Sequence, residues 1–186
     1  MLILASASPR RKELMEAAGF EFRIIVADDE AETSVSRELE PAMFVEVAAR
    51  AKAENVMQDL STGIVVAADT IAVLDNEIIG KPQDVDHARQ ILTALQGTEH
   101  EVLTGMVVGN ASNQSVCSHV ECTKLRMTEL SGPQLEEYLE TGAWEGKAGA
   151  FGYQDGLDWV TIVEGLESNV VGLPVELLPD LIAQVR

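Results

Sequence analysis

Short apolar runs alternate with helix-like segments along the whole chain, and this alternation is the feature that most restricts the fold. Runs rich in β-branched residues and bounded by polar residues or glycine predict strands. The expected strands are Leu2–Ala5, Phe22–Val26, Ile64–Ala68, Ile71–Leu74, Val102–Val108, Val116–Arg126, Ala150–Tyr153, Trp159–Val163 and Asn169–Val171. The expected helices are Pro9–Ala18, Pro41–Gln58, Asp84–Gln96, Pro133–Thr141 and Val175–Val185. Because the two kinds of element are interspersed, we expect an α/β protein of the mixed α+β type.

Length and charge narrow the class of protein. With 186 residues, 46% of them hydrophobic, we expect one globular domain over residues 1–186. A net charge of −18 argues against a nucleic-acid partner. No window has about 18 uncharged apolar residues, so we expect no membrane span and no membrane partner. The chain start lacks a signal-peptide pattern and the two cysteines suit a reducing compartment, so we expect a cytoplasmic protein.

The segment SASPRRKEL contradicts the usual charge preference of a helix start. Ser8 is a good N-cap and Pro9 suits the first helical position. The positive end of the helix dipole favours acidic residues there, yet Arg10, Arg11 and Lys12 follow. One interpretation is a solvated basic helix start with ordinary capping. The other is an anion site, in which free backbone N–H groups, the Ser6 and Ser8 hydroxyls and the two arginines bind phosphate.

Carboxylates follow two of the expected strands. Asp69 and Thr70 come at the end of the apolar run IVVAA, where an ion is costly to bury without a partner. Asp69 could hold Mg²⁺ or act as a general base, or it could simply open a turn to Ile71. The acidic run Asp28–Glu30 follows the strand that ends at Val26, and could complete a metal site or be a solvated loop.

Two lysines occur where a phosphate ligand could be placed. Lys52 shares a helix face with Val45, Ala48 and Val56, so its ammonium either reaches out to solvent or points into a cleft. Lys81 lies in Gly-Lys-Pro, a rigid turn that aims it at one place, unless it is an ordinary surface lysine. Phosphate-type cations with hard carboxylates together indicate a Mg²⁺-dependent polyphosphate site.

Three other patterns resemble functional motifs but lack residues that those motifs require. Gly142–Lys147 resembles a P-loop, but has three residues between its glycines where four are needed, and Ala148 replaces the Ser/Thr that would bind Mg²⁺. The Cys117–Cys122 segment lacks the second ligand pair of a zinc site. His100 has no Ser or Cys partner in a triad-like context. We therefore assign no function to them.

Six motifs run in order from about residue 2 to the C-terminus: LILASASPRRKEL, AKA at 51–53, VVAADTIAVLDNEIIGKP, GTEHEVLTG, KAGAFGYQ and NVVGLP. Together they resemble the Maf family of nucleoside triphosphate pyrophosphatases. The resemblance implies an extended central mixed sheet with flanking helices. It also implies two lobes around a nucleotide cleft, a fold related to the inosine triphosphate pyrophosphatases.

The same resemblance implies a reaction and roles for residues. The reaction is hydrolysis of a nucleoside triphosphate to the monophosphate and pyrophosphate with a divalent cation, Mg²⁺ or alternatively Mn²⁺ or Co²⁺. Asp69 matches the proton acceptor, and Ser6, Arg11, Lys52 and Lys81 match phosphate-site positions, with Ser8 beside them. Glu30 matches an acidic position that, together with Asp69, is linked to the metal, although Asp28, Asp29 and Glu32 leave the register open.

The resemblance extends to the choice of substrate. The branch that acts on dTTP and UTP has Arg after Ser-Pro, Thr after the catalytic Asp, and Gln in a G-x-Q motif; here these are Arg10, Thr70 and Gln154. A Gln amide can pair with the adjacent donor and acceptor of a uracil or thymine edge. The alternatives are a 7-methyl-GTP pyrophosphatase and a non-catalytic nucleotide-sensing regulator of cell division. Homodimers are common among such enzymes, although no residue of this chain indicates one.

Overall fold

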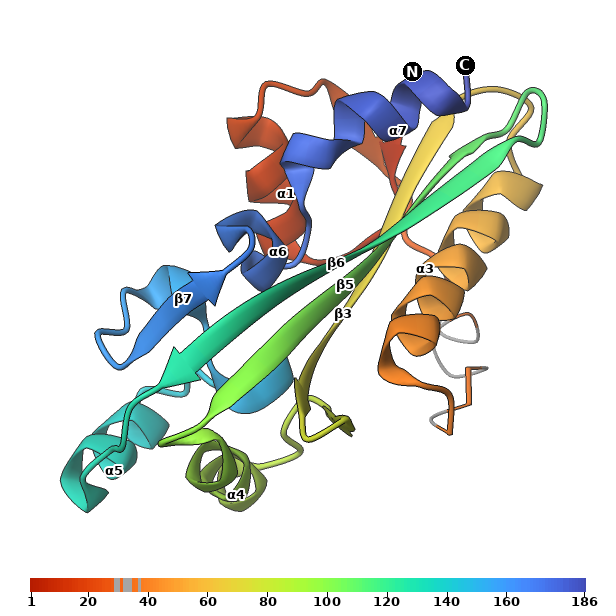
Figure 1. Ribbon diagram of the computed structural model, residues 1–186. Helices are drawn as coiled ribbons and strands as arrows, with labels where there is room; N and C mark the ends of the chain where they lie inside the picture. The colour runs from red at the N-terminus through yellow and green to blue at the C-terminus, as the bar shows by residue number, and fades with distance from the viewer. Residues whose placement is uncertain (29–30, 32–34, 37) are drawn as a thin grey trace.

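The computed structural model describes residues 1–28, 31, 35–36 and 38–186 (Figure 1). Its strands are β1 Leu2–Leu4, β2 Phe22–Ile24, β3 Ile64–Leu74, β4 Glu77–Ile79, β5 Glu99–Asn110, β6 Val116–Met127 and β7 Val160–Glu164. Its α-helices are α1 Pro9–Ala17, α3 Pro41–Gln58, α4 Val85–Leu95, α5 Gly132–Glu140, α6 Glu167–Val171 and α7 Leu178–Gln184. Short 3₁₀ turns are η1 Ala148–Ala150, η2 Tyr153–Asp155 and η3 Val175–Leu177.

The described strands form one seven-stranded mixed sheet in the order β2-β1-β3-β5-β6-β7, with β4 also paired to β3. β1 is parallel to both β2 and β3, and the other pairs are antiparallel. The long strands β3, β5 and β6 run through the whole molecule, with α3 on one side and α1 and α7 on the other (Figure 1). The predicted α/β class with an extended mixed sheet is confirmed.

One edge of β3 changes its partner halfway along the strand. β5 pairs with β3 from Ile64 to Val73 and therefore occupies one edge. On the other edge, β1 pairs with residues 64–66 and β4 with residues 72–74. The sheet therefore has a break beside residues 67–71, and β1 ends there and leads into α1. Ligand sites in α/β proteins favour such places, where a strand ends and the chain turns away.

Asp69 and Thr70 lie inside β3, so the prediction that they end a strand was wrong. The predicted strands Ile64–Ala68 and Ile71–Leu74 are one continuous strand, because β5 pairs with it through the polar residues as well. Asp75 and Asn76 form the hairpin turn between β3 and β4, with φ of 50° and 67°.

Two further predicted strands near the C-terminus were wrong. In the predicted strand Ala150–Tyr153, Ala150 ends η1 with a φ of 60° and Tyr153 begins η2, so only Phe151 and Gly152 between them are extended. Asn169–Val171 belongs to α6. The start of α1 was predicted correctly, because Ser8 caps it. At the start of α5, Ser131 and Gln134 form a capping box.

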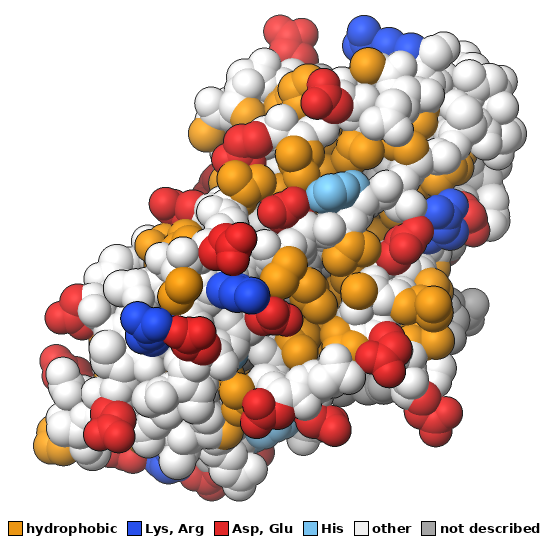
Figure 2. Space-filling model, in the orientation of Figure 1, with side chains coloured by type: hydrophobic (Ala, Val, Ile, Leu, Met, Phe, Trp, Pro, Cys, Tyr) orange, Lys and Arg blue, Asp and Glu red, His pale blue; other side chains and the backbone are white. Residues whose placement is uncertain are grey.

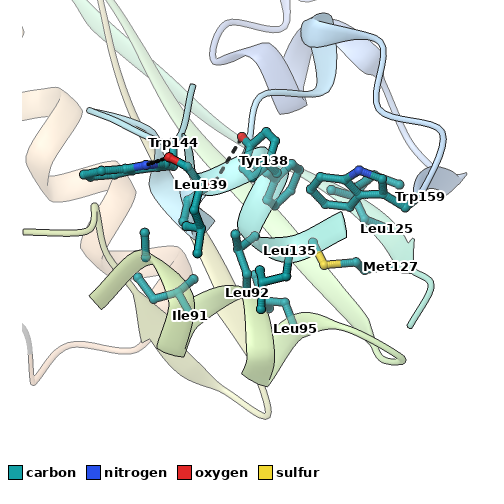
Figure 3. Close-up of a cluster of buried hydrophobic side chains, with 14 of the residues drawn as sticks. Ile91, Leu92, Leu95, Leu125, Met127, Leu135, Tyr138, Leu139, Trp144 and Trp159 are labelled. Carbon is teal, nitrogen blue, oxygen red and sulfur yellow. Dashed lines mark hydrogen bonds between the residues drawn. The ribbon is translucent and has the colours of Figure 1, made fainter. Parts of the chain in front are cut away.

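Separate apolar cores cover the two ends of the sheet and form the two lobes. At one end, α4 and α5 pack against the sheet over a cluster that includes Tyr138, Trp144 and Trp159 (Figure 3). Tyr138 meets Trp159 edge to face at 5.2 Å between centroids, and the Trp144 indole N–H donates to the Leu139 carbonyl. At the other end, α1 and α7 cover one face of the sheet and α3 the opposite face. Within the described residues, no helix combines the length and apolar composition needed to cross a membrane.

Small residues let α3 approach the sheet closely. Ala49 and Ala53 pack against the sheet in the same buried cluster as Val65 and Ala67. Gly105 on β5 allows the closest approach, because a Cβ at this position would lie 2.2 Å from the Val45 carbonyl oxygen. Gly105 is also the β5 residue paired with Asp69. The closest contact between α3 and the sheet therefore lies next to the Asp69 carboxylate, and Gly105 makes it possible.

We expect Gly105→Ala to destabilise the fold by about 1–3 kcal/mol, because the added methyl group must push α3 away from β5. Gly132→Ala is the matched control, since a Cβ there meets nothing within 4 Å, and it should change stability by less than about 0.5 kcal/mol. Urea unfolding measures both. Equal midpoints for the two variants would show that α3 has room to move.

Candidate active site

A cleft of about 470 Å³ lies at the break in the sheet. The β1–α1 connection forms one wall, Asp69 and Thr70 on β3 lie at the break, and the segment from Glu145 to Gln154 forms another wall. The volume is in the usual range for small-molecule sites. Nine of the predicted site residues line this cleft: Ser6, Ser8, Arg10, Arg11, Lys52, Asp69, Thr70, Lys81 and Gln154. Asp28, which the sequence offered as a candidate metal ligand, is not among the residues that line it.

The cleft concentrates the few cations of an acidic protein. Of the 13 lysines and arginines in the chain, Arg10, Arg11, Lys52, Lys81 and Lys147 line it. The face drawn in Figure 2 is instead scattered with acidic side chains and has few cations. Since the overall charge of −18 repels anions, local cations are what an anionic ligand would need.

Lys52 and Asp69 form the central ion pair of the site. The Lys52 Nζ donates to the Asp69 Oδ1 at 2.7 Å. Lys52 lies on the sheet-facing side of α3 and is only 5% exposed, so it points into the cleft rather than reaching out to open solvent. Asp69 meets it because alternate residues of β3 face opposite sides, and the odd-numbered Val65 and Ala67 also pack on the α3 side.

Arg11 approaches from the opposite face of the sheet. Its Nε donates to the Gly172 carbonyl at 2.8 Å, its Nη1 to the Ser6 hydroxyl at 3.2 Å, and its Nη2 to the Thr70 hydroxyl at 3.1 Å. Three contacts from three segments fix the plane of the guanidinium group. Asp69 and Thr70 are neighbours in β3, so one strand brings the two cations to the cleft from opposite faces.

The start of α1 adds hydrogen-bond donors to the same wall. The Ser8 hydroxyl accepts from the Arg11 backbone N–H at 3.5 Å, and the Ser8 N–H donates to the Ser6 hydroxyl at 3.2 Å. Arg10 donates to the Gly146 carbonyl across the cleft at 3.4 Å. Lys12, the third cation of SASPRRKEL, instead lies 3.6 Å from Glu16 on the exposed side of α1.

Lys147 lines the cleft although the sequence analysis assigned it no role. Its ammonium forms an ion pair with Asp155, next to Gln154. Gly152 leaves room for that pair, since a Cβ there would lie 2.4 Å from the Lys147 Nζ. The sequence feature that could have indicated a role for Lys147 is its position as the first residue of KAGAFGYQ, the motif that ends in Gln154. The segment is not a P-loop, because a turn after α5 leads to it and η1 follows.

The described donors suit Mg²⁺ that is bound together with a polyphosphate. Asp69 and Glu145 are the described carboxylates that line the cleft, and no group of three or more His, Cys, Asp or Glu among the described residues could hold a metal alone. Asp28 exchanges hydrogen bonds with Asn55. Glu30, Asp29 and Glu32 lie outside the described residues. Mg²⁺ commonly takes one or two carboxylates and completes its shell with phosphate oxygens and water, which fits Asp69.

Phe151 forms an apolar part of the cleft wall, and His100 packs behind it. The two rings meet edge to face at 5.6 Å between centroids. His100 is 3% exposed, and neither ring nitrogen has a hydrogen-bond partner among the described residues. Burial lowers the pKa of His100 to about 4. The histidine therefore serves as a neutral packing group.

Comparison with known proteins identifies the family. Residues 1–185 match the family model described as Maf-like protein. The chain belongs to the Maf family. Among Maf relatives, a protein named dTTP/UTP pyrophosphatase from Rhodopirellula baltica is 46% identical over 183 residues, which are 97% of this chain and 80% of the relative. A second protein of that name, from Ruminiclostridium cellulolyticum, is 37% identical over 188 residues, which are 100% of this chain and 96% of the relative.

A solved structure supports the fold assignment. The structure of a HAM1 protein from Coxiella burnetii superposes with a TM-score of 0.53, covers 98% of both chains and is 14% identical. At this identity the similarity concerns the fold alone.

His100 should make stability fall on acidification. Its pKa is about 4 in the fold and about 6.5 when exposed, so the unfolded chain binds more protons between these values. The contribution is complete above pH 6.5 and should fall by about 2 kcal/mol by pH 5. Urea unfolding of His100→Leu at pH 7 and pH 5 should show a pH effect smaller than wild type by that amount. An unchanged pH effect in His100→Leu would contradict the assignment.

Proposed function

We propose that this Maf-family protein hydrolyses dTTP and UTP to the monophosphate and pyrophosphate. The observation that carries the proposal is one cleft in which Asp69 is paired with Lys52 and surrounded by four more cations. The names of the relatives from Rhodopirellula baltica and Ruminiclostridium cellulolyticum support it. A carboxylate beside converging cations suits water attack on a phosphoanhydride, in which a base activates the water and cations stabilise phosphate charge.

Asp69 takes the role of general base. The Lys52 bond to Oδ1 fixes the orientation of the carboxylate, and its other oxygen, Oδ2, accepts a proton from the attacking water. The water oxygen bonds to the α-phosphorus while the bond to the bridging oxygen breaks. Pyrophosphate then leaves with the electron pair of that bond. Attack from the side opposite the leaving group requires the triphosphate to lie along the cation-lined wall.

Cations and backbone donors stabilise the phosphate charge. Arg11 is pre-oriented by its contacts with Gly172, Ser6 and Thr70. Lys52, Lys81 and the start of α1 add further positive charge. Fixed donors of this kind cost little reorganisation when the charge develops. A Mg²⁺ ion held mainly by the substrate phosphates and water, beside Asp69, would supply additional charge neutralisation.

Gln154 is the side chain that we assign to the pyrimidine edge. It lines the cleft from η2, and Arg10 lies on the facing wall. An amide offers the adjacent acceptor and donor that uracil and thymine require. Thr70 also lines the cleft, but its hydroxyl is bonded within the protein to Arg11 and Thr104. The 7-methyl-GTP alternative lacks support from these positions, and a regulator that only binds nucleotide has no need of the Asp69 base.

The test measures pyrophosphate released from dTTP, UTP, CTP, GTP, 7-methyl-GTP and ITP in the presence of Mg²⁺. We expect release from dTTP and UTP, and a loss of at least about 100-fold in kcat for Asp69→Asn, since the amide cannot take the proton. The matched control is Asp75→Asn in the β3–β4 turn, where Asn tolerates the positive φ, and it should keep full activity.

Other outcomes of this experiment would contradict the proposal in distinct ways. Release from 7-methyl-GTP alone would overturn the pyrimidine assignment and leave the hydrolytic site in place. Tight nucleotide binding without any release would favour the regulator. Full activity of Asp69→Asn would remove Asp69 from the role of base.

Removal of divalent cations should abolish the release of pyrophosphate. The described cleft offers few carboxylates, so the ion depends on the substrate phosphates and should be lost readily to EDTA. Added Mg²⁺ should restore the rate, and Mn²⁺ and Co²⁺ are the alternatives to compare. Undiminished turnover in excess EDTA would show that the cations of the protein suffice.

A further inference from the structure

A chain of hydrogen bonds leads from Arg11 into the protein interior. The Arg11 Nη2 donates to the Thr70 hydroxyl at 3.1 Å, which lies 2.9 Å from the Thr104 hydroxyl. The Thr104 hydroxyl donates to the Asn169 carbonyl at 3.1 Å. Thr70 and Thr104 face each other as paired residues of β3 and β5, which explains their contact.

The direction of these bonds follows from counting protons. A threonine hydroxyl has one proton to donate. Thr104 uses its proton on the Asn169 carbonyl, so it accepts from Thr70. Thr70 therefore accepts from Arg11 and donates to Thr104. The Gly172 carbonyl is the other possible acceptor for the Thr70 proton, but at 3.3 Å it is farther away than the Thr104 hydroxyl at 2.9 Å. Bonds that run in one direction polarise and strengthen one another.

The far end of this chain is held rigidly. Asn169 is fully buried, and its Nδ2 donates to the Val102 carbonyl at 2.9 Å and to the Thr123 hydroxyl at 3.0 Å. Val102 and Thr123 are themselves paired residues of β5 and β6. The middle of α6 is thus attached to the centre of the sheet, and the Asn169 carbonyl is a fixed acceptor.

Two groups that fix Arg11, directly or through the hydrogen-bond chain, come from one short segment around α6. Gly172, whose carbonyl accepts from the Arg11 Nε, follows α6 directly, and Asn169 lies inside α6. Thr104 is fully buried and is not among the residues that line the cleft. It can therefore act on a ligand only through other residues.

We propose that Thr104 is a positioning residue that orients the Arg11 guanidinium group through Thr70. The catalytic consequence rests on the proposed function, because Arg11 is there the group that stabilises phosphate charge. Thr104→Val keeps the shape of the side chain but removes both the acceptor for Thr70 and the donor to Asn169. Thr70 can then turn its proton to the Gly172 carbonyl, and the acceptor for the Arg11 Nη2 is no longer fixed. Small displacements of a catalytic group cost large factors in rate.

The first test is a double-mutant cycle on kcat and KM for dTTP. We expect Thr104→Val to lower kcat by about 10-fold with a change in KM below about twofold, and Thr104→Ser to restore most of the rate. In an Arg11→Met background, Thr104→Val should change kcat by less than about twofold, because the group that it orients is absent. An equal loss of kcat on Thr104→Val in both backgrounds would show that Thr104 acts only through packing, and would overturn the proposal.

A control variant separates positioning from loss of stability. Val108 is a fully buried residue of the same strand β5 whose side chain belongs to the cluster around α1 and α7. Val108→Ala removes buried volume without touching the hydrogen-bond chain, and it should leave kcat within about twofold of wild type. A loss of kcat in Val108→Ala as large as in Thr104→Val would contradict the proposal.

A second measurement does not depend on activity. In protein labelled with ¹⁵N-arginine, the Arg11 side-chain signals are identified by their loss in Arg11→Met. We expect separate Nη–H signals in wild type and Thr104→Ser, and signals averaged by faster rotation in Thr104→Val. Unchanged signals in Thr104→Val would overturn the positioning role whatever the kinetics show. If wild type released no pyrophosphate but the signals changed as expected, the proposed function would fail and the positioning role would stand.

Discussion

A lysine ammonium on the sheet-facing side of α3 requires an anionic partner, and the organisation of the site follows from that requirement. Lys52 lies on a helix face that is otherwise built from small and apolar residues, where an unpaired ion would be costly. Asp69 supplies the charge from the middle of β3. For the two to meet, α3 must lie close to the sheet, which explains the alanines on its inner face and the glycine opposite Asp69.

The break in the sheet edge makes this pair accessible to a ligand. A strand that is paired on both edges and covered on both faces offers its side chains to the core alone. Along β3 the outer edge lacks a β1 or β4 partner beside residues 67–71, so the polar residues there reach the cleft. The resulting site combines contributions from both faces of the sheet: Lys52 with Asp69 on one, and Arg11 with Thr70 on the other.

Several residues of the candidate site could be predicted from sequence because they conflict with the usual preferences of helices. Cations at a helix start and a lysine on an apolar stripe conflict with ordinary structural preferences, and Arg11 and Lys52 do line the cleft. The strand through Asp69 and the helix at Asn169 were mispredicted, since pairing with β5 and anchoring by distant strands determine them. Thr104 belongs to the GTEHEVLTG motif, but the sequence predicted no role for it, because the importance of a buried threonine in a strand depends on partners that only the structure shows.

The long pairing between β3 and β5 stabilises the sheet, and it also determines which side chains meet in the cleft. Neighbouring residues of a strand face opposite sides, so a shift of β3 by one position would exchange the faces of Asp69 and Thr70. The carboxylate would then meet the guanidinium group of Arg11, and Lys52 would face a hydroxyl. The ten paired positions from Ile64 to Val73 make that slip improbable. The register of the sheet is thus itself a determinant of the chemistry, although most of the residues that enforce it never touch a ligand.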